Sequence, residues 1–466
     1  MSASPAVNKY NLTEGGILRK LLLVALPIMG TQFIQMAYNL TDMFWLGRVG
    51  SDAVAASGAA GMYLWLSFGF LLIGRMGAEI GVSQSLGRRD KRAALIFSQN
   101  AMLIAIVLGL LFGLCLLIFN RELAHFFKFR ELKVTEDTAA YLSIVAWAIP
   151  ATFISAVITG SFNASGNSHT PFVLNGIGLG ANVILDPVFI LVLHMEVRGA
   201  AIATVISQLI VCAGLLLAIT RFKSRPFERY PIKIRIEKEK IILILKWTVP
   251  IALESLFFCF LSMITSRIEA SFGAHAIAAS KVGSQIESLS WLIGGGFGSA
   301  LIAFIGQNYG AGKWERIRRG VRISAMAMAV WGIFVTLLLW FAGGFLFSLF
   351  LPDPELARLG ARYLRILAFC QLAMNLEAVT AGAFKGTGRT LIPSAVSITA
   401  NLLRPVLAFV LSRTSLGLNG VWIGITITAN IRSIWICFWY IFRKKDREQN
   451  AAPPQARRRD GMVNPL

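Results

Sequence analysis

A single carboxylate, Asp42, lies within the first long apolar stretch of the chain, which runs from about residue 17 to residue 46. A charged side chain at the centre of a bilayer costs several kcal/mol on insertion scales, so such an acid is a candidate for ion or substrate binding. Tyr38 precedes it by four residues and therefore shares its helix face. The alternative is a helix end wetted by interfacial water, because two glycines follow within eight residues.

A second acid, Asp186, lies in the fifth apolar stretch, four residues after Asn182 and directly before Pro187. The spacing places Asn182 and Asp186 on one helix face, and Thr204 in the next stretch offers a hydroxyl. Carboxylates, an amide oxygen and a hydroxyl suit a small hard cation such as Na⁺. They suit a proton equally, because two neighbouring carboxylates repel each other when both are ionised. A structural role for Asp186 beside its own proline remains open.

The composition predicts an all-helical membrane protein. The 466 residues are 56% hydrophobic and only 15% charged, with a mean hydropathy of +0.65. Apolar runs longer than the roughly 20 residues that cross a bilayer recur along the chain, and they are too continuous for a β-barrel. We expect about twelve spans, near residues 17–46, 53–86, 93–120, 138–162, 169–194, 199–220, 241–271, 275–309, 320–350, 357–384, 391–412 and 420–442.

The formal net charge of +21 reflects membrane topology rather than nucleic-acid binding, because Lys and Arg gather in alternate loops. These loops lie near residues 88–92, 221–240, 313–322 and 443–447. We therefore expect a multi-pass protein of the cell inner (plasma) membrane with both termini in the cytoplasm. The predicted segments are a cytoplasmic N-terminus (1–16), a first lobe (17–220), a basic cytoplasmic linker (221–240), a second lobe (241–442) and a basic, disordered cytoplasmic tail (443–466).

The two predicted lobes repeat each other. Pro27 and Pro250 are 223 positions apart, and the same offset aligns Ala53-Val54-Ala55-Ala56-Ser57 with Ala276-Ile277-Ala278-Ala279-Ser280. It also aligns Gln84 with Gln307 and Gly87 with Gly310. Each half begins and ends on the same side, so the repeat is parallel, about an axis along the membrane normal. Two such lobes would leave a cleft between them and could rock around it.

Polar residues in the spans suggest where a solute would bind and where the helices would bend. In the second half Arg404 takes the position before a proline that Asp186 holds in the first, and it and Arg432 could face the cleft and favour anionic or zwitterionic solutes. Internal ion pairing is the simpler alternative. The residues that we expect to line the substrate cavity are Gln35, Asn39, Asn163 and Arg404. Pro27 and Pro187 are the expected hinges, since proline removes a helical hydrogen bond.

The chain resembles the multidrug and toxic compound extrusion (MATE) family of transporters over roughly residues 15–445. The resemblance rests on Leu26-Pro27-Ile28 through Asp42, on Gly47-Arg48-Val49-Gly50 before an Ala-rich helix start, and on Ser83-Gln84 to Gly87 before a basic loop. It is nearest to the DinF-like branch. That branch implies coupling of efflux to H⁺ or Na⁺ at Asp42, Asp186, Asn182, Thr204 and Tyr38, and bending of the first span about Pro27. Another branch uses acids on spans seven and ten, but the spacing of Glu254 and Glu377 does not match it well enough to transfer that role.

We therefore predict a secondary active antiporter, not an enzyme, that exports organic solutes or drugs by alternating access between two lobes. We expect no cofactor and no metal beyond a possible Na⁺ at the coupling site. Its partners would be a small organic substrate and the lipid bilayer but no nucleic acid, and it would be a monomer. The alternative is a lipid-linked oligosaccharide flippase of the same superfamily, which would show a strongly basic central cavity.

Overall fold

The computed structural model describes residues 10–129, 131–231, 234–350 and 354–442 and is all-helical over these ranges. Twelve helical segments in it are long and apolar enough to cross a membrane, which confirms the predicted fold class. The predicted tail, 443–466, and most of the N-terminus, 1–9, lie outside the described residues. The helices are α2 (Ile17–Val49), α3 (Ser51–Gly87), α4 (Lys91–Ile118), α5 (Asn120–His125), α6 (Leu132–Val145), α7 (Ile149–Ala164), α8 (His169–Pro187), α9 (Glu196–Arg221), α10 (Lys238–Ala270), α11 (Ala274–Gly310), α12 (Trp314–Ser348), α13 (Pro354–Gly386), α14 (Leu391–Ser412) and α15 (Leu418–Phe442).

Some boundaries differ from the sequence prediction. The fourth span is longer than predicted, because α6 and α7 are joined through a short 3₁₀ turn (Ala146–Ala148) into one continuous span. The fifth span ends in a π-helical turn (Val188–Val192) that directly follows Pro187. The short helix α5 was not predicted, since it lies in the mixed-charge loop between the third and fourth spans.

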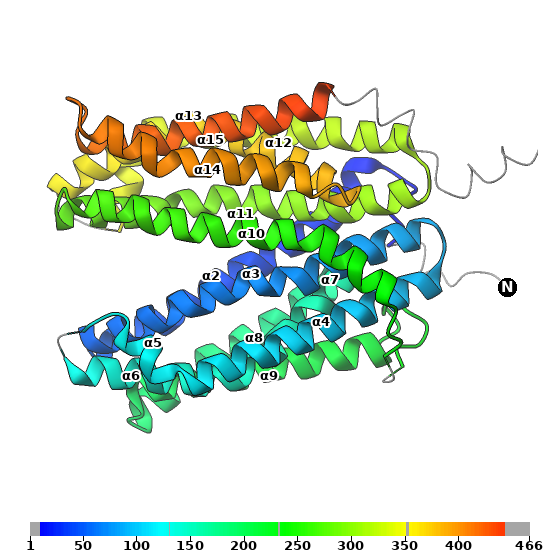
Figure 1. Ribbon diagram of the computed structural model, residues 1–466, viewed down its shortest axis with the longest axis horizontal. Coiled ribbons are helices and arrows are strands. Elements are labelled where there is room, and N and C mark those ends of the chain that lie inside the picture. Colours follow the sequence, from blue (N-terminus) through cyan, green and yellow to red (C-terminus); the bar gives the residue numbers. More distant parts are fainter. Residues whose placement is uncertain (1–9, 130, 232–233, 351–353, 443–466) are drawn as a thin grey trace, which may run out of the picture.

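The helices form two groups that lie side by side (Figure 1). α2 to α9 make up the N lobe and α10 to α15 the C lobe, and the two lobes diverge away from the end at which α2 begins. That end, which also holds the α9–α10 connection, carries the loops rich in Lys and Arg between the helices. We call it the basic end.

Helix α2 packs against both lobes. Its first half, including Leu21, Val24 and Ile28, is buried in one apolar cluster with Phe297 and Leu301 of α11 in the C lobe. Its second half contacts α8 and α9 of the N lobe through Asp42, which lies beside Asn182 and Thr204. Pro27 lies within the half of α2 that contacts the C lobe. The helix that carries Asp42 is therefore shared between the lobes.

The connection between α9 and α10 is docked onto the N lobe. Asn100 of α4 is fully buried, and its amide nitrogen donates a hydrogen bond to the Arg235 carbonyl oxygen at 3.0 Å while its amide oxygen accepts one from the Glu237 backbone nitrogen at 3.0 Å. Beside it, the Tyr230 hydroxyl lies 3.3 Å from the Ser98 hydroxyl, and burial raises the pKa of Tyr230 to about 12. The link between the lobes is thus held by specific bonds to α4.

Asn100→Ala should lower the thermal stability of the protein, because it leaves the two backbone groups of the linker without their partner. Each such buried group costs roughly 1–3 kcal/mol when unsatisfied. The midpoint of thermal unfolding in detergent, followed by intrinsic fluorescence, should fall by several degrees. Asn175→Ala is the control, since among the described residues Asn175 bonds only to the Pro171 carbonyl of its own helix. Equal midpoints for the two variants would contradict this role.

Candidate functional site

The predicted acids of the first and fifth spans meet inside the N lobe. The amide nitrogen of Asn182 donates to Asp42 Oδ1 at 3.4 Å and to Asp186 Oδ1 at 3.1 Å. The Thr204 hydroxyl donates to Asp42 Oδ2 at 3.4 Å. The two carboxyl groups are also within hydrogen-bond reach of each other. We call Asp42, Asn182, Asp186 and Thr204 the acidic cluster.

The acidic cluster is enclosed and retains unused oxygen atoms. Asn182 and Asp186 are fully buried, and Asp42 is half-buried. Asn182 Oδ1 and Asp186 Oδ2 have no hydrogen-bond partner among the described residues. Buried polar atoms are rarely left unpaired. These oxygens are therefore suited to take a proton or to coordinate a small cation.

Two tyrosines border the acidic cluster. Tyr38 is buried near both acids, and its hydroxyl fits against Gly178 of α8, where an added Cβ would lie 2.5 Å from it. Tyr141 of α6 was not predicted, although it is buried near Thr204 and both acids. No spacing rule links α6 to α9, because only the folded lobe brings these helices together.

The break in the fifth span explains the position of Asp186. Pro187 has no backbone N–H, so it cannot bond to the Val183 carbonyl as a helical residue would. The chain continues as a π-helical turn, in which the Leu193 backbone nitrogen bonds to the Val188 carbonyl at 2.9 Å. Gly199 of α9 permits the close approach of this turn, because an added Cβ would lie 2.7 Å from the Phe189 carbonyl group. Such turns occur often at functional sites.

A separate cavity of about 740 Å³ lies between the lobes. Residues of α2, α3, α10, α11, α13 and α15 line it, and Gln35 and Asn39 are among them. The acidic cluster does not line this cavity. Helix α2 presents Gln35 and Asn39 to the cavity and, on an adjacent face, Asp42 to the acidic cluster.

The structure corrects two other expectations about this cavity. Asn163 is buried one residue before the end of α7, at the basic end, and is outside the cavity wall. Arg404 of α14 is also buried outside the wall, where its guanidinium group lies 5.2 Å from the centre of the Phe258 ring. Both residues were predicted from their place in a span, which does not specify the face on which they lie.

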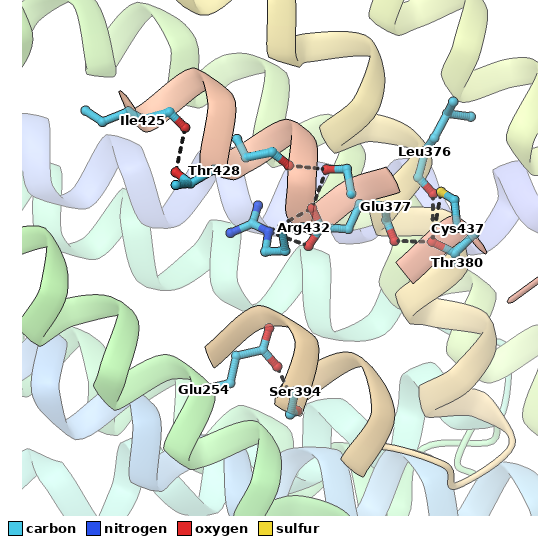
Figure 2. A network of polar contacts seen from close by, with 11 residues as sticks. Glu254, Leu376, Glu377, Thr380, Ser394, Ile425, Thr428, Arg432 and Cys437 are labelled. Atoms are coloured by element: carbon cyan, nitrogen blue, oxygen red, sulfur yellow. Dashed lines mark hydrogen bonds and ion pairs between the residues drawn. The ribbon is translucent and has the colours of Figure 1, made fainter. Parts of the chain in front are cut away.

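Charged residues of the C lobe line the cavity, and Figure 2 shows their contacts within that lobe. Glu377 lies in the wall and forms an ion pair with Arg432 at 2.8 Å, in which both side chains are almost buried. Glu254 also lies in the wall and accepts a hydrogen bond from the Ser394 hydroxyl at 2.8 Å. Of the two alternatives considered for Arg432, its ion pair with Glu377 fits internal pairing. Arg432 also lies in the cavity wall.

Comparisons with known proteins agree on the family. The family model MatE matches residues 27–188 and 250–410, one copy in each half. The chain is 26% identical over 443 residues to "Probable multidrug resistance protein NorM" of Thermotoga maritima (92% of this chain, 94% of that protein) and 25% identical to "Probable multidrug resistance protein YoeA" of Bacillus subtilis (96% and 98%). A crystal structure described as "MATE in the bent conformation" superposes with a TM-score of 0.89 at 20% identity, covering 97% of this chain and 100% of that one.

Asn182→Ala should destabilise the protein more at high pH than at low pH. The amide bridges the two carboxyl groups, and without it their mutual repulsion is unrelieved when both are ionised. Protonation of one acid at low pH lets the two groups bond directly to each other. The drop in unfolding midpoint should thus grow from pH 5 to pH 9. In an Asp42→Asn background the pH dependence of the drop should vanish, and a drop of the same size at every pH would refute the bridging role.

Proposed function

Because the chain belongs to the MatE family, we propose that it is a secondary active transporter that exports organic solutes from the cytoplasm in exchange for H⁺ or Na⁺. The observation that carries this proposal is the shared amide of Asn182, which holds Asp42 and Asp186 together inside a membrane-spanning lobe. A buried acid pair with free oxygens is an ion site, and a cavity between lobes is a solute site. The DinF-like assignment, suggested by the same residues, is part of the proposal.

Exchange requires that the ion and the solute each prefer one arrangement of the lobes. Helix α2 provides the link, since it carries Asp42 and also lines the cavity with Gln35 and Asn39. Protonation or Na⁺ binding at the acidic cluster removes the repulsion between its carboxylates and lets α2 draw closer to α8 and α9. Bending of α2 about Pro27, with Pro187 as the second hinge, would then change the shape of the cavity wall and release the solute.

We infer the orientation from the distribution of basic residues. The basic end lies on the cytoplasmic side of the cell inner membrane, in accordance with the positive-inside rule. Both termini then lie in the cytoplasm, and the linker of residues 221–240 joins the lobes on that side. The acidic cluster is assembled by helices of one lobe, which supports a monomer as the working unit.

Asp42→Asn should abolish ion-driven efflux with little loss of folded protein. The amide keeps the shape of the carboxyl group but can neither ionise nor bind a proton reversibly. Purified protein in liposomes with separately imposed H⁺ and Na⁺ gradients would measure dye transport and identify the coupling ion. Asp52→Asn, at the start of α3, is the matched control and should transport normally. Undiminished gradient-driven transport by Asp42→Asn would refute the proposed coupling.

The charges of the cavity support solutes that carry an anionic group on an apolar body. The wall contains the cations Arg75, Lys385 and Arg432 and the acids Glu254 and Glu377. Because Arg432 pairs with Glu377, Arg75 of α3 and Lys385 of α13 remain without an ion-pair partner among the described residues.

A buried acid on α3 itself offsets part of this charge. Glu79 is fully buried and within electrostatic reach of both Arg75 and Lys385. These three groups together carry one net positive charge, which Glu254 in the wall balances. The mixture of signs also favours an exporter over the alternative oligosaccharide flippase, for which we expected a strongly basic cavity.

Arg75→Gln and Lys385→Gln should each raise the KM for an anionic dye about tenfold, because a charge-assisted hydrogen bond contributes about 1.5–3 kcal/mol. The KM for a cationic dye of similar size should stay the same or fall. Lys246→Gln, an exposed residue of α10 outside the cavity, is the control. Efflux of the anionic dye with an unchanged KM in both variants would exclude this substrate class and leave the ion-coupling proposal untouched.

A further inference from the structure

At the basic end, the two lobes are joined by a pair of matching hydrogen bonds. Gln84 of α3 donates from its amide nitrogen to the carbonyl oxygen of Gly386 at 3.0 Å, crossing from the N lobe to the C lobe. Gln307 of α11 donates in the same way to the carbonyl oxygen of Ala164 at 2.8 Å, crossing from the C lobe to the N lobe. Both glutamine side chains are buried.

These two bonds are related by the internal repeat. Gln84 and Gln307 are 223 positions apart, and Ala164 and Gly386 are 222 positions apart, the offsets that relate the two halves of the chain. Ala164 is the last residue of α7 and Gly386 the last residue of α13. The final carbonyls of a helix have no partner within it. Each glutamine thus caps a helix of the opposite lobe, and it can do so only while the lobes touch at this end.

The contact beside each glutamine is equally reciprocal. A Cβ added at Gly87 would lie 2.0 Å from the carbonyl oxygen of Gln307, and one added at Gly310 would lie 2.0 Å from the carbonyl oxygen of Gln84. No side chain fits at either position, so α3 and α11 cross backbone to backbone. The two glycines therefore permit the close approach of α3 and α11, and the hydrogen bonds of the two glutamines stabilise it.

The start of the chain reinforces one of these bonds. The backbone nitrogen of Leu12, a fully buried residue, donates to Gln307 Oε1 at 3.0 Å. The Leu12 carbonyl oxygen accepts hydrogen bonds from Asn308 Nδ2 at 3.2 Å and from Arg316 at 3.3 Å. Gln307 consequently bonds at once to the N lobe and to the segment that leads into α2.

We propose that Gln84 and Gln307 form the gate that closes the basic end of the transporter in one arrangement of the lobes. When the lobes separate there, both amides and both helix-end carbonyls exchange their mutual bonds for water. The inference rests on the proposed alternating access and is independent of which ion is coupled and which solute is carried.

The distance between the lobes at the basic end tests this gate. Spin labels on Arg92→Cys of α4 and Arg322→Cys of α12, both exposed, would report it by double electron–electron resonance in lipid nanodiscs. The background is a variant that lacks the five natural cysteines and retains transport. Gln84→Ala and Gln307→Ala should each raise the ratio of long to short distances about fivefold, and together about 25-fold, because each loses one buried hydrogen bond that crosses between the lobes. Gln208→Ala, a glutamine of α9 outside this contact, should leave the ratio unchanged.

Glycine variants test the same closure by a different route. Gly87→Ala and Gly310→Ala should hold the basic end open and slow transport, whereas Gly61→Ala, whose Cβ would meet nothing within 4 Å, should do neither. Hydrogen–deuterium exchange on the protein with its natural cysteines gives a second readout, with faster exchange expected around residues 10–14 in Gln307→Ala. Distance distributions that stay unchanged in the double glutamine variant would overturn the gate, whatever Asp42→Asn does to coupling.

Discussion

The arrangement of the whole molecule depends on one helix being packed into two lobes at once. α2 buries its first half among residues of α11 and its second half against α8 and α9. A change of charge at Asp42 alters the packing of the second half of α2 against the N lobe. The first half, packed against the C lobe, must either move with it or resist the movement. Because a close-packed interior responds by switching between arrangements rather than by gradual deformation, a local change of charge can select between two positions of the lobes.

Because the proposed ion site is separate from the cavity, coupling between ion and solute depends on α2. If the acidic cluster lined the cavity, a cationic solute could compete directly with the ion for Asp42. The cluster instead lies inside the N lobe, on an adjacent face of α2. Competition between ion and solute must therefore pass through the position of the helix, and the two ligands need not resemble each other. An exporter of varied solutes benefits from this arrangement, because the ion site stays constant while the cavity adapts.

Much of this architecture follows from the sequence, and the exceptions share a cause. The spans and the repeat follow from apolar length and a constant offset, and the shared face of Asn182 and Asp186 follows from helical spacing. The place of Asp42 beside them was expected from the family resemblance, since no spacing rule joins the first span to the fifth. Arg404 and Asn163 were placed in the cavity although the structure buries them elsewhere, since a span that is apolar on all sides gives no sign of which face a polar residue occupies. The place of Tyr141 near the acids and the role of Gln84 and Gln307 could not be predicted, because both depend on contacts between helices that are far apart in the sequence. The repeat did align the two glutamines, but only the structure shows that each reaches a helix end in the opposite lobe.

The chemistry of the proposed gate suits a protein that must open and close repeatedly. Breaking a buried ion pair by removing one partner costs about 3–5 kcal/mol, whereas a neutral hydrogen bond contributes roughly 1 kcal/mol net. Coupling free energies between ligands are typically 1–3 kcal/mol. A closure made of two neutral amides is therefore within the range that ion or solute binding can reverse, while one made of buried ion pairs would hold the lobes in a single state. The chain does contain such an ion pair, Glu377–Arg432, but both partners belong to the C lobe and can move with it as one body.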